Sequence, residues 1–297
     1  MAIRTARRRS RLALTATEER AAPDGGCLAL PQRNSGVPCP RRRTGVKFRC
    51  CVVAVTALGL AAGAGPAAAA SPDALPDLAM YKLSDFRMEK TPDQRRLLRY
   101  TTIIVNIGAG NFQAEGTRAS AAQPEMSVVQ RIFDFAGASR VRSTAARMYW
   151  SGDGHSHWHL RDLETSSLDR ADNGVKVGST AKHGFCFFDN IKFNLLLPGS
   201  PPNVSYTGCG TDPTVLTQSM GLSIGWGDAY YYNLVDQWVD ITGLVPGRYR
   251  LTTTADAQNW FVESDEYNNL TWTELQINKN GPPRVTAQGP YALLPSG

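Results

Sequence analysis

The chain has 297 residues, a formal net charge of +6, and 42% hydrophobic against 20% charged residues. The positive charge is local: residues 1–70 hold 12 of the 32 basic and 3 of the 26 acidic residues, which leaves 20 basic and 23 acidic residues in 71–297. Residues 71–297 are therefore slightly acidic. The positive charge of the whole chain is thus no argument for nucleic-acid binding by this part.

The first 70 residues are expected to be absent from the mature protein. Residues 1–45 are rich in Arg, Pro and Gly and lack apolar periodicity, which predicts a disordered basic leader; translation from near Val46 would omit it. Residues 46–70 predict a signal peptide, in which the apolar run Cys50–Leu60 leads to small residues and cleavage between Ala70 and Ser71. The run is too short to span a bilayer, so we expect a secreted protein rather than an integral membrane protein, with a membrane anchor as the alternative.

The rest of the chain predicts short strands, because apolar and β-branched residues alternate and no stretch of twelve residues carries a helical stripe. The Pro- and Gly-rich segment 197–217 is expected to be irregular and to form a wall of the site. The predicted strands cover residues 99–107, 126–135, 156–168, 185–188, 237–241, 248–254 and 271–277. Turn signals at 245–247 and 278–283 separate the last of them. This pattern predicts an all-β, β-sandwich-like single domain over 71–280, with long irregular loops, little helix and a tail over 281–297.

Three of the four histidines lie within five residues, in the run Gly-His-Ser-His-Trp-His over 154–159. On an extended strand His155, His157 and His159 would share one face. A flat strand would separate the outer two by roughly 13 Å. A metal–nitrogen bond is about 2 Å long, so the strand must twist or bulge. Imidazole suits copper, zinc and nickel, and the run predicts a metal site; a solvated histidine face is the alternative.

Two cysteines, Cys186 and Cys209, remain once the leader is removed. In an exported protein we expect them to form a disulfide, which would contribute ~3 kcal/mol in the chain-entropy model. The alternative is a pair of free thiols that bind metal.

Five motifs, taken in order, resemble the lysyl oxidase family. The histidine run resembles its copper-binding H-x-H-x-H motif, and the order and spacing agree from about Pro76 to Ile277. The other four are Lys182-His-Gly-Phe-Cys186, Gly221-Leu-Ser-Ile-Gly-Trp-Gly-Asp-Ala-Tyr230, Gln237-Trp-Val-Asp-Ile-Thr-Gly243 with Pro246-Gly-Arg-Tyr249, and Glu263-Ser-Asp-Glu-Tyr-Asn-Asn269. Residues 71–280 would then be the catalytic domain.

The resemblance implies a secreted copper-dependent amine oxidase. Copper would be bound by the three histidines, and the lysine tyrosylquinone cofactor would form from Lys182 and Tyr230. The substrates would be O2 and a primary amine, either a protein lysine or a small amine, and the products an aldehyde, hydrogen peroxide and ammonia. Cofactor formation requires Lys182 to lose its proton, which burial and a nearby metal charge would favour.

Asp228 is a candidate catalytic base, because it lies two residues before Tyr230 and shares a strand face with it. The alternative is that Asp228 holds a turn. His183 is a weaker candidate for a supporting group. Tyr230 is the first of three consecutive tyrosines, and its spacing from the flanking motifs selects it.

A structural calcium site is also implied by the resemblance. Oxygen-bearing side chains suit a hard cation, and the site would connect the start of the domain to a C-terminal hairpin. The alternative is an acidic β-turn with Asn as turn former. The implied ligands are Asp77, the carbonyl of Leu78, Glu263, Asp265, Asn268 and Asn269.

The chain also departs from the family. It keeps two cysteines where animal members carry several more, and it has Gly152 and Asp153 where they have further His and Cys; Asp153 could accept a hydrogen bond from an imidazole. We expect no accessory domains. Two alternative functions therefore stay open: a zinc hydrolase with three histidine ligands and an activated water, or a non-catalytic secreted metal-binding β-sandwich protein.

Overall fold

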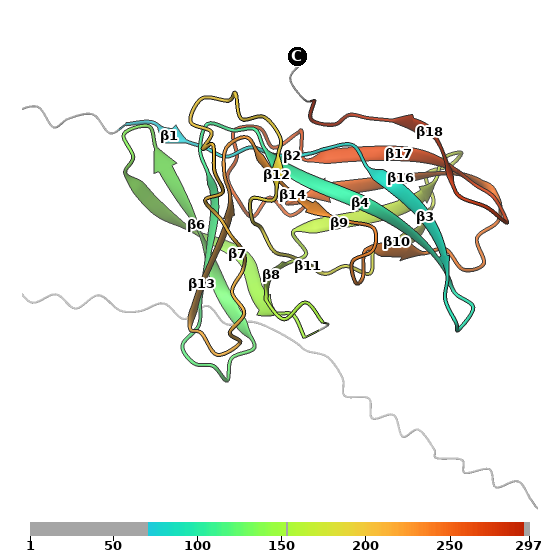
Figure 1. Cartoon of the computed structure of the whole chain (residues 1–297), viewed down its shortest axis with the longest axis horizontal. Helices are drawn as coiled ribbons and strands as arrows, with labels where there is room; N and C mark the ends of the chain where they lie inside the picture. The colour runs from blue at the N-terminus through green and yellow to red at the C-terminus, as the bar shows by residue number, and fades with distance from the viewer. Residues whose placement is uncertain (1–70, 153, 294–297) are drawn as a thin grey trace, which may run out of the picture. The chain divides into compact units, whose positions relative to one another are not determined.

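Every regular element among residues 71–152 and 154–293 is a β-strand in the computed structural model, which describes these residues of the chain (Figure 1). They belong to one unit, Gly65–Gly297. The all-β prediction with little helix is confirmed. The expected leader, the signal peptide and Asp153 lie outside the described residues. Within the described part, there is no helix of the length and apolarity that crossing a membrane requires.

The strands form three antiparallel sheets. The seven-stranded sheet has the order β11-β8-β7-β6-β5-β13, with β1 beside β6. Its strands are β1 (Asp73–Ala74), β5 (Phe112–Thr117), β6 (Glu125–Asp134), β7 (Ser139–Trp150), β8 (Trp158–Arg161), β11 (Gly184–Phe185) and β13 (Thr217–Leu222).

The other two sheets have six and five strands. The six-stranded sheet has the order β12-β14-β4-β15, with β2 and β3 also paired to β4; the five-stranded sheet has the order β10-β9-β16-β17-β18. The six strands are β2 (Leu78–Met80), β3 (Ser84–Lys90), β4 (Arg96–Asn106), β12 (Ile191–Lys192), β14 (Trp226–Tyr230) and β15 (Trp238–Asp240). The five are β9 (Glu164–Arg170), β10 (Lys176–Ser179), β16 (Gly247–Ala255), β17 (Leu270–Ile277) and β18 (Arg284–Gln288).

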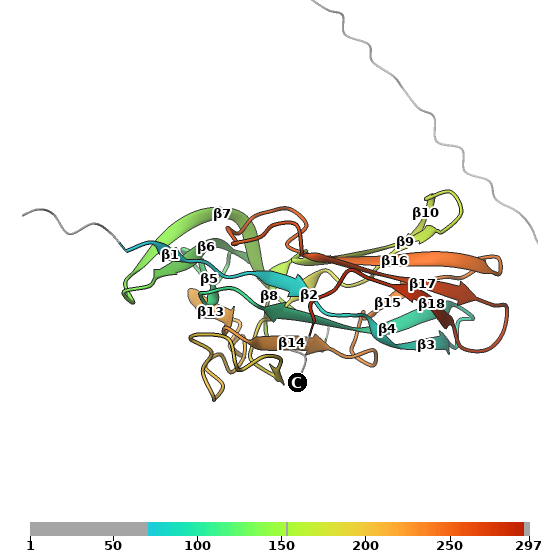
Figure 2. The same ribbon diagram turned by 90° about the horizontal axis from the view of Figure 1, so that it is seen from above.

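The six- and five-stranded sheets lie face to face. Figure 2 shows β16 and β17 in one layer and β3 and β4 in the layer opposite, and β2 contacts both β16 and β17. Alternating residues of β9, β16 and β17 are buried, and Tyr100, Leu168, Tyr249 and Leu275 are among the fully buried residues of the core. This packing gives the sandwich-like core that the alternating pattern predicts.

Five of the predicted strands correspond to β4, β6, β15, β16 and β17, and residues 197–216 contain no strand, as expected. The prediction of one strand over 156–168 is wrong. The chain bends at Asp162, whose φ of 50° is left-handed, and continues as the separate strands β8 and β9. The predicted strand 185–188 is reduced to β11. Residues 284–288, within the expected tail, form β18 and pair with β17.

Candidate functional site

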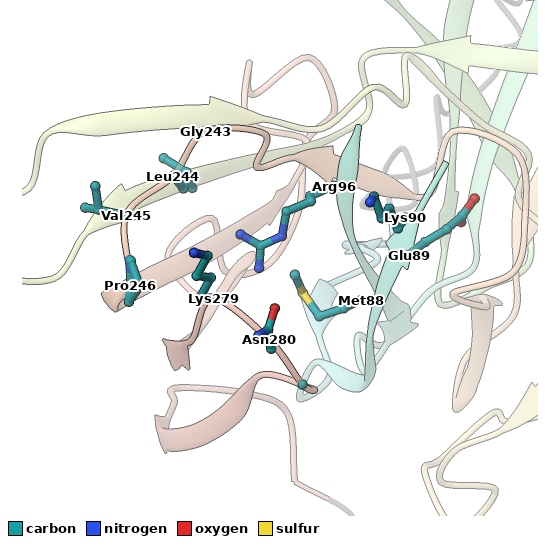
Figure 3. Close-up of a pocket in the computed structure, with 11 residues that line it drawn as sticks. Met88, Glu89, Lys90, Arg96, Gly243, Leu244, Val245, Pro246, Lys279 and Asn280 are labelled. Carbon is teal, nitrogen blue, oxygen red and sulfur yellow. The ribbon is translucent and has the colours of Figure 1, made fainter. Parts of the chain in front are cut away.

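One sizeable cavity lies away from the histidine run and from Lys182 and Tyr230. It has a volume of about 580 Å³ and opens between the ends of β3 and β4 and the turn before β16 (Figure 3). Its charged lining, Glu89, Lys90, Arg96 and Lys279, is mostly basic and carries no metal-ligand or nucleophile cluster. The residues that could bind a metal lie instead around the histidine run.

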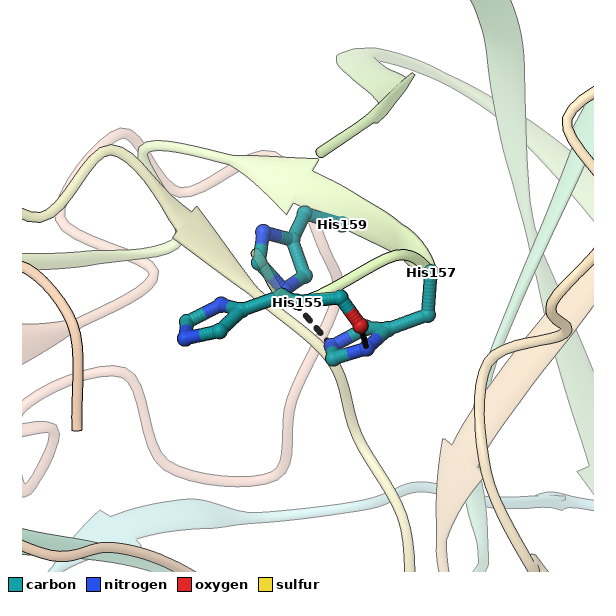
Figure 4. Close-up of side chains that lie close together, drawn as sticks. All are labelled: His155, His157 and His159. Carbon is teal, nitrogen blue, oxygen red and sulfur yellow. Dashed lines mark hydrogen bonds between the residues drawn. The ribbon is translucent and has the colours of Figure 1, made fainter. Parts of the chain in front are cut away.

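The three imidazoles of the histidine run converge (Figure 4). His159 is buried in β8, whereas His155 and His157 lie half-buried in the loop before that strand. The loop is bent rather than extended, because Gly154 and Ser156 have φ values of 97° and 51°. As a result, one ligand atom from each imidazole lies within 4.8 Å of the other two. The bend that a single metal ion requires is thus present.

The spacing of the nitrogens fits a first-row transition metal. The Nε2 atoms of His157 and His159 are 2.8 Å apart. Two nitrogens bound at about 2.0 Å to one ion, at a right angle, would lie about 2.8 Å apart. The Nδ1 atom of His157 is 2.6 Å from the carbonyl oxygen of His155, so it donates and Nε2 carries the lone pair. These residues could therefore hold copper or zinc.

Gly184 allows β11 to approach β8 closely at His159. The two strands pair through Gly184 and Arg161. A Cβ atom on Gly184 would lie 2.5 Å from Nδ1 of His159 and 2.3 Å from Oη of Tyr149. Any side chain there would displace the imidazole, so a glycine at this position is needed for the site.

Lys182 and Tyr230 meet in the interior beside the imidazoles. Lys182 lies in the loop before β11, and Tyr230 ends β14, where it pairs with Thr102 of β4. The Nζ atom of Lys182 is 3.2 Å from the centroid of the Tyr230 ring, and both residues are 6% exposed. Tyr231 is 48% exposed, so Tyr230 is the member of the tyrosine triplet that faces the lysine.

Glu164 is a site residue that the sequence reasoning missed. Its Oε2 atom is 3.2 Å from Nζ of Lys182 and accepts a hydrogen bond of 2.9 Å from Oγ1 of Thr102. Burial lowers the pKa of Lys182 to about 8, although the charge of Glu164 and its hydrogen bond act in the opposite direction. The period-two spacing of the strand could have identified it. Glu164, Ser166 and Leu168 lie two residues apart on the same buried face of β9, which places a carboxylate on the inner face of that strand.

Asp228 lies fully buried in the middle of β14, so it holds no turn. Nδ2 of Asn190 donates to its Oδ1 atom. Burial raises the pKa of Asp228 well above its usual range, and the positive charge of Lys182 opposes that shift. His183, in contrast, is exposed and bonds Asp162 at 3.1 Å, outside the imidazole cluster.

The disulfide between Cys186 and Cys209 is present, and it supports both halves of the site. The backbone N–H of Cys186 donates to Oη of Tyr230 over 2.7 Å. The carbonyl of Cys209 accepts the N–H of Trp158, the residue between two histidines. The prediction of a disulfide is confirmed, and the alternative of two free thiols is wrong.

The residues of the implied calcium site are brought together from the two ends of the domain. A carboxylate oxygen of Glu263 accepts the N–H of Leu78, and Asn268 donates to Asp77 over 2.7 Å. Asn269 donates to Glu263 over 2.8 Å. Asp265 instead accepts the N–H of Tyr267 within its own turn. Two further carboxylates, Asp256 and Glu266, approach Glu263 so that ligand atoms lie within 4.8 Å.

This second cluster could hold a cation. Burial raises the pKa of Glu263 to about 9, and burial also raises the pKa of Asp77. Among the described residues, Oε2 of Glu266 and the Oδ1 atoms of Asn268 and Asn269 are buried without a hydrogen-bond partner. Oxygens in this arrangement are the ligands that a hard cation prefers. The sequence reasoning missed Asp256 and Glu266.

Comparison with known proteins agrees with the motifs. The family model for lysyl oxidase matches residues 120–286. Lysyl oxidase homolog 3 of Homo sapiens is 26% identical over 180 residues, which cover 59% of this chain and 18% of that protein. Lysyl oxidase homolog 2 of Xenopus tropicalis is 26% identical over 191 residues, which cover 62% of this chain and 19% of that protein. The match thus spans less than a fifth of these relatives. Because the family model covers more than half of the chain, this protein belongs to the lysyl oxidase family.

Proposed function

We propose that the protein is a secreted copper-dependent amine oxidase, which converts a primary amine, O2 and water into an aldehyde, ammonia and hydrogen peroxide. The observation that carries this proposal is the contact between Lys182 and Tyr230, whose Nζ-to-centroid distance is 3.2 Å. The contact lies beside three converging imidazoles. Family membership supports the same reaction class.

His155, His157 and His159 would hold the copper ion. When bound there, copper supplies the one-electron and oxygen chemistry that protein side chains lack. Lys182 and Tyr230 would form the lysine tyrosylquinone cofactor, which supplies the carbonyl group and accepts two electrons from the amine. The chain's own residues then have to position these groups, exclude water and move protons.

Lys182 has to lose a proton before its nitrogen can bond to carbon, because an ammonium has no lone pair. Oε2 of Glu164, 3.2 Å away, is in position to take that proton. The transfer would convert a buried ion pair into a neutral pair, so neither side chain would stay charged in the apolar interior. Burial already holds the pKa of Lys182 at about 8, which makes the loss easier near neutral pH.

Contacts to both its hydroxyl group and its ring fix the orientation of Tyr230. The N–H of Cys186 fixes its Oη atom, and the ring of Phe185 packs at 4.3 Å between centroids. Only 6% of the residue is exposed, which keeps bulk water from the ring. Asp228 is the proposed base for the substrate's α-proton; its deep burial would make it a stronger base when it is ionised.

A structural calcium ion is proposed at the second cluster, with Asp77, the carbonyl of Leu78, Glu263, Asp265, Asn268 and Asn269 as ligands. The support is the set of buried oxygens without partners and the raised pKa of Glu263. Because the cluster joins β2 to the segment before β17, the ion would stabilise the closure of the domain. The disulfide, which is typical of oxidising compartments, supports secretion.

Two other functions use the same imidazoles. A zinc hydrolase would bind zinc and activate water, and a non-catalytic member would bind metal without turnover. In both cases the buried contact between Lys182 and Tyr230 would have no chemical use. The fate of these two side chains therefore distinguishes the three functions.

Peptide mass spectrometry on the copper-loaded, air-exposed full-length protein is the test. A single species that joins the Lys182 and Tyr230 peptides, with an oxidised ring, is expected. Tyr230→Phe should lose the joined species. Tyr231→Phe is the matched control, because it removes the same hydroxyl group from the neighbouring residue, and it should retain the species. Two separate, unmodified peptides after loading with copper would overturn the oxidase proposal.

A further inference from the structure

Two cavities adjoin His155, and they differ in chemistry. One, of about 230 Å³, is lined by Lys182, Arg161, His183 and Asp236 among others. The second, of about 360 Å³, lies against Tyr230. Lys182 contributes only to the first lining and Tyr230 only to the second, so the two reacting side chains face different cavities. An amine that reacts at the Tyr230 ring would reach it through the second cavity.

The second cavity is apolar. Four of its eight lining residues are Phe188, Ala229, Tyr231 and Leu234, and the rest include the imidazoles of His155 and His157. Among the described residues that line it, none is Asp, Glu, Lys or Arg. Its volume is within the range of cavities that enclose a small organic ligand.

The remaining polar lining residue, Asn190, has its amide already engaged. Its Nδ2 atom donates to Asp228, and its Oδ1 atom accepts the N–H of Ala229 over 2.9 Å. Asp228, the proposed base at the reacting end of the amine, is fully buried, accepts a hydrogen bond from that amide and does not line the cavity that would hold the tail. A second positive charge on a bound amine would therefore lose its water without gaining a carboxylate partner.

We propose that the cavity beside Tyr230 selects small primary amines with an uncharged aliphatic or aromatic tail and discriminates against diamines. This inference rests on the proposed oxidase function and names its substrate class. The tail of the amine packs against Phe188, Tyr231 and Leu234, while the amino group points towards Tyr230. Each methylene of the tail that becomes buried should raise kcat/KM about fourfold.

The test compares hexylamine with 1,5-diaminopentane, which has the same number of non-hydrogen atoms. With the copper-loaded full-length protein, kcat/KM for hexylamine should be at least tenfold higher. Leu234→Asp places a carboxylate in the cavity wall and should shift the ratio at least tenfold towards the diamine. Leu196→Asp, at a residue that is 85% exposed and outside both linings, is the matched control and should leave the ratio unchanged.

A binding measurement keeps this inference separate from the oxidase proposal. Calorimetry on the copper-free protein, in which no turnover occurs, should give a Kd for hexylamine at least tenfold below that for 1,5-diaminopentane. Equal or tighter binding of the diamine would overturn the substrate class, whether or not the protein is an oxidase. Absence of the joined Lys182–Tyr230 species together with the expected binding preference would overturn only the oxidase proposal.

Discussion

The Nζ atom of Lys182 lies 3.2 Å from the centroid of the Tyr230 ring, although the two residues come from different sheets. Lys182 precedes β11 of the seven-stranded sheet, and Tyr230 ends β14 of the six-stranded sheet. The pair therefore exists only when both sheets are assembled. Because the reacting atoms are already adjacent, no entropy is lost in bringing them together.

Cross-link formation between Lys182 and Tyr230 should be pH-dependent. Its rate should rise as pH increases through about 8, where the Lys182 amine loses its proton. Glu164→Gln removes the charge that raises the pKa of Lys182, so the midpoint should move to lower pH. The plateau rate should also fall at least tenfold, because an amide cannot take up the proton. Mass spectrometric time courses from pH 6 to 9.5 measure both quantities.

Asp162→Asn is the control for that experiment. Asp162 is a partly exposed carboxylate in the turn before β9, and its partner is His183 rather than Lys182. This variant should keep the wild-type midpoint and plateau. An unchanged or higher midpoint in Glu164→Gln would contradict the assigned role of Glu164.

Copper binding should depend on three of the four histidines. His155→Ala, His157→Ala and His159→Ala should each weaken copper binding by more than about 100-fold, because even the loss of a residue that merely supports a ligand costs 10–100-fold. His183→Ala should bind one equivalent normally, since this side chain is exposed and bonds Asp162. Metal analysis after dialysis against a chelator measures the difference. Equal losses in all four variants would argue against a defined site.

The stability of the metal-free protein should fall as pH rises from about 5 to 9. The pKa of Glu263 is raised from 4.5 to about 9, so over this range the folded state keeps a proton that the unfolded chain has released. The unfolded state then binds fewer protons, and the free energy of unfolding decreases with pH. Thermal melts in a chelating buffer measure this slope, which Glu263→Gln should flatten.

Calcium should replace that proton. Its addition should therefore raise Tm more at pH 8 than at pH 5, because the cation has to displace the Glu263 proton against a far higher proton concentration at pH 5. Magnesium at the same concentration should have a smaller effect, since it demands a tighter octahedral site. A calcium-induced change in Tm that is the same at both pH values would contradict a site built on Glu263.

Loss of the disulfide should affect both stability and chemistry. Cys209→Ser should cost about 3 kcal/mol in the free energy of unfolding. This corresponds to a decrease in Tm of about 6–12 °C for a domain of this size. Cross-link yield should also fall at temperatures where the variant is still folded, because the N–H of Cys186 orients Tyr230. The double variant Cys186→Ser/Cys209→Ser should be no worse than either single one.

Local patterns predicted a large part of the fold. The strands β16 and β17 were predictable because their inward and outward residues alternate cleanly, and β4 was predictable from its β-branched residues. The longest strand, β7, was missed because it carries three arginines and only two fully buried residues. The strand β14 was missed for the opposite reason: all five of its residues are buried, so it shows no alternation. The hydrophobic pattern of a single strand does not show which other strands cover its two faces.

The sequence by itself determined the chemistry that is available: three histidines in five residues, a lysine and a tyrosine in matching motifs, and two cysteines. Tertiary structure decided which of these groups meet. The partner of Lys182, Glu164, lies in β9 of a different sheet, and the left-handed φ of Ser156 turns a row of imidazoles into a cluster. The physical reason is that burial and pairing depend on long-range packing, whereas residue type and spacing are local properties of the chain.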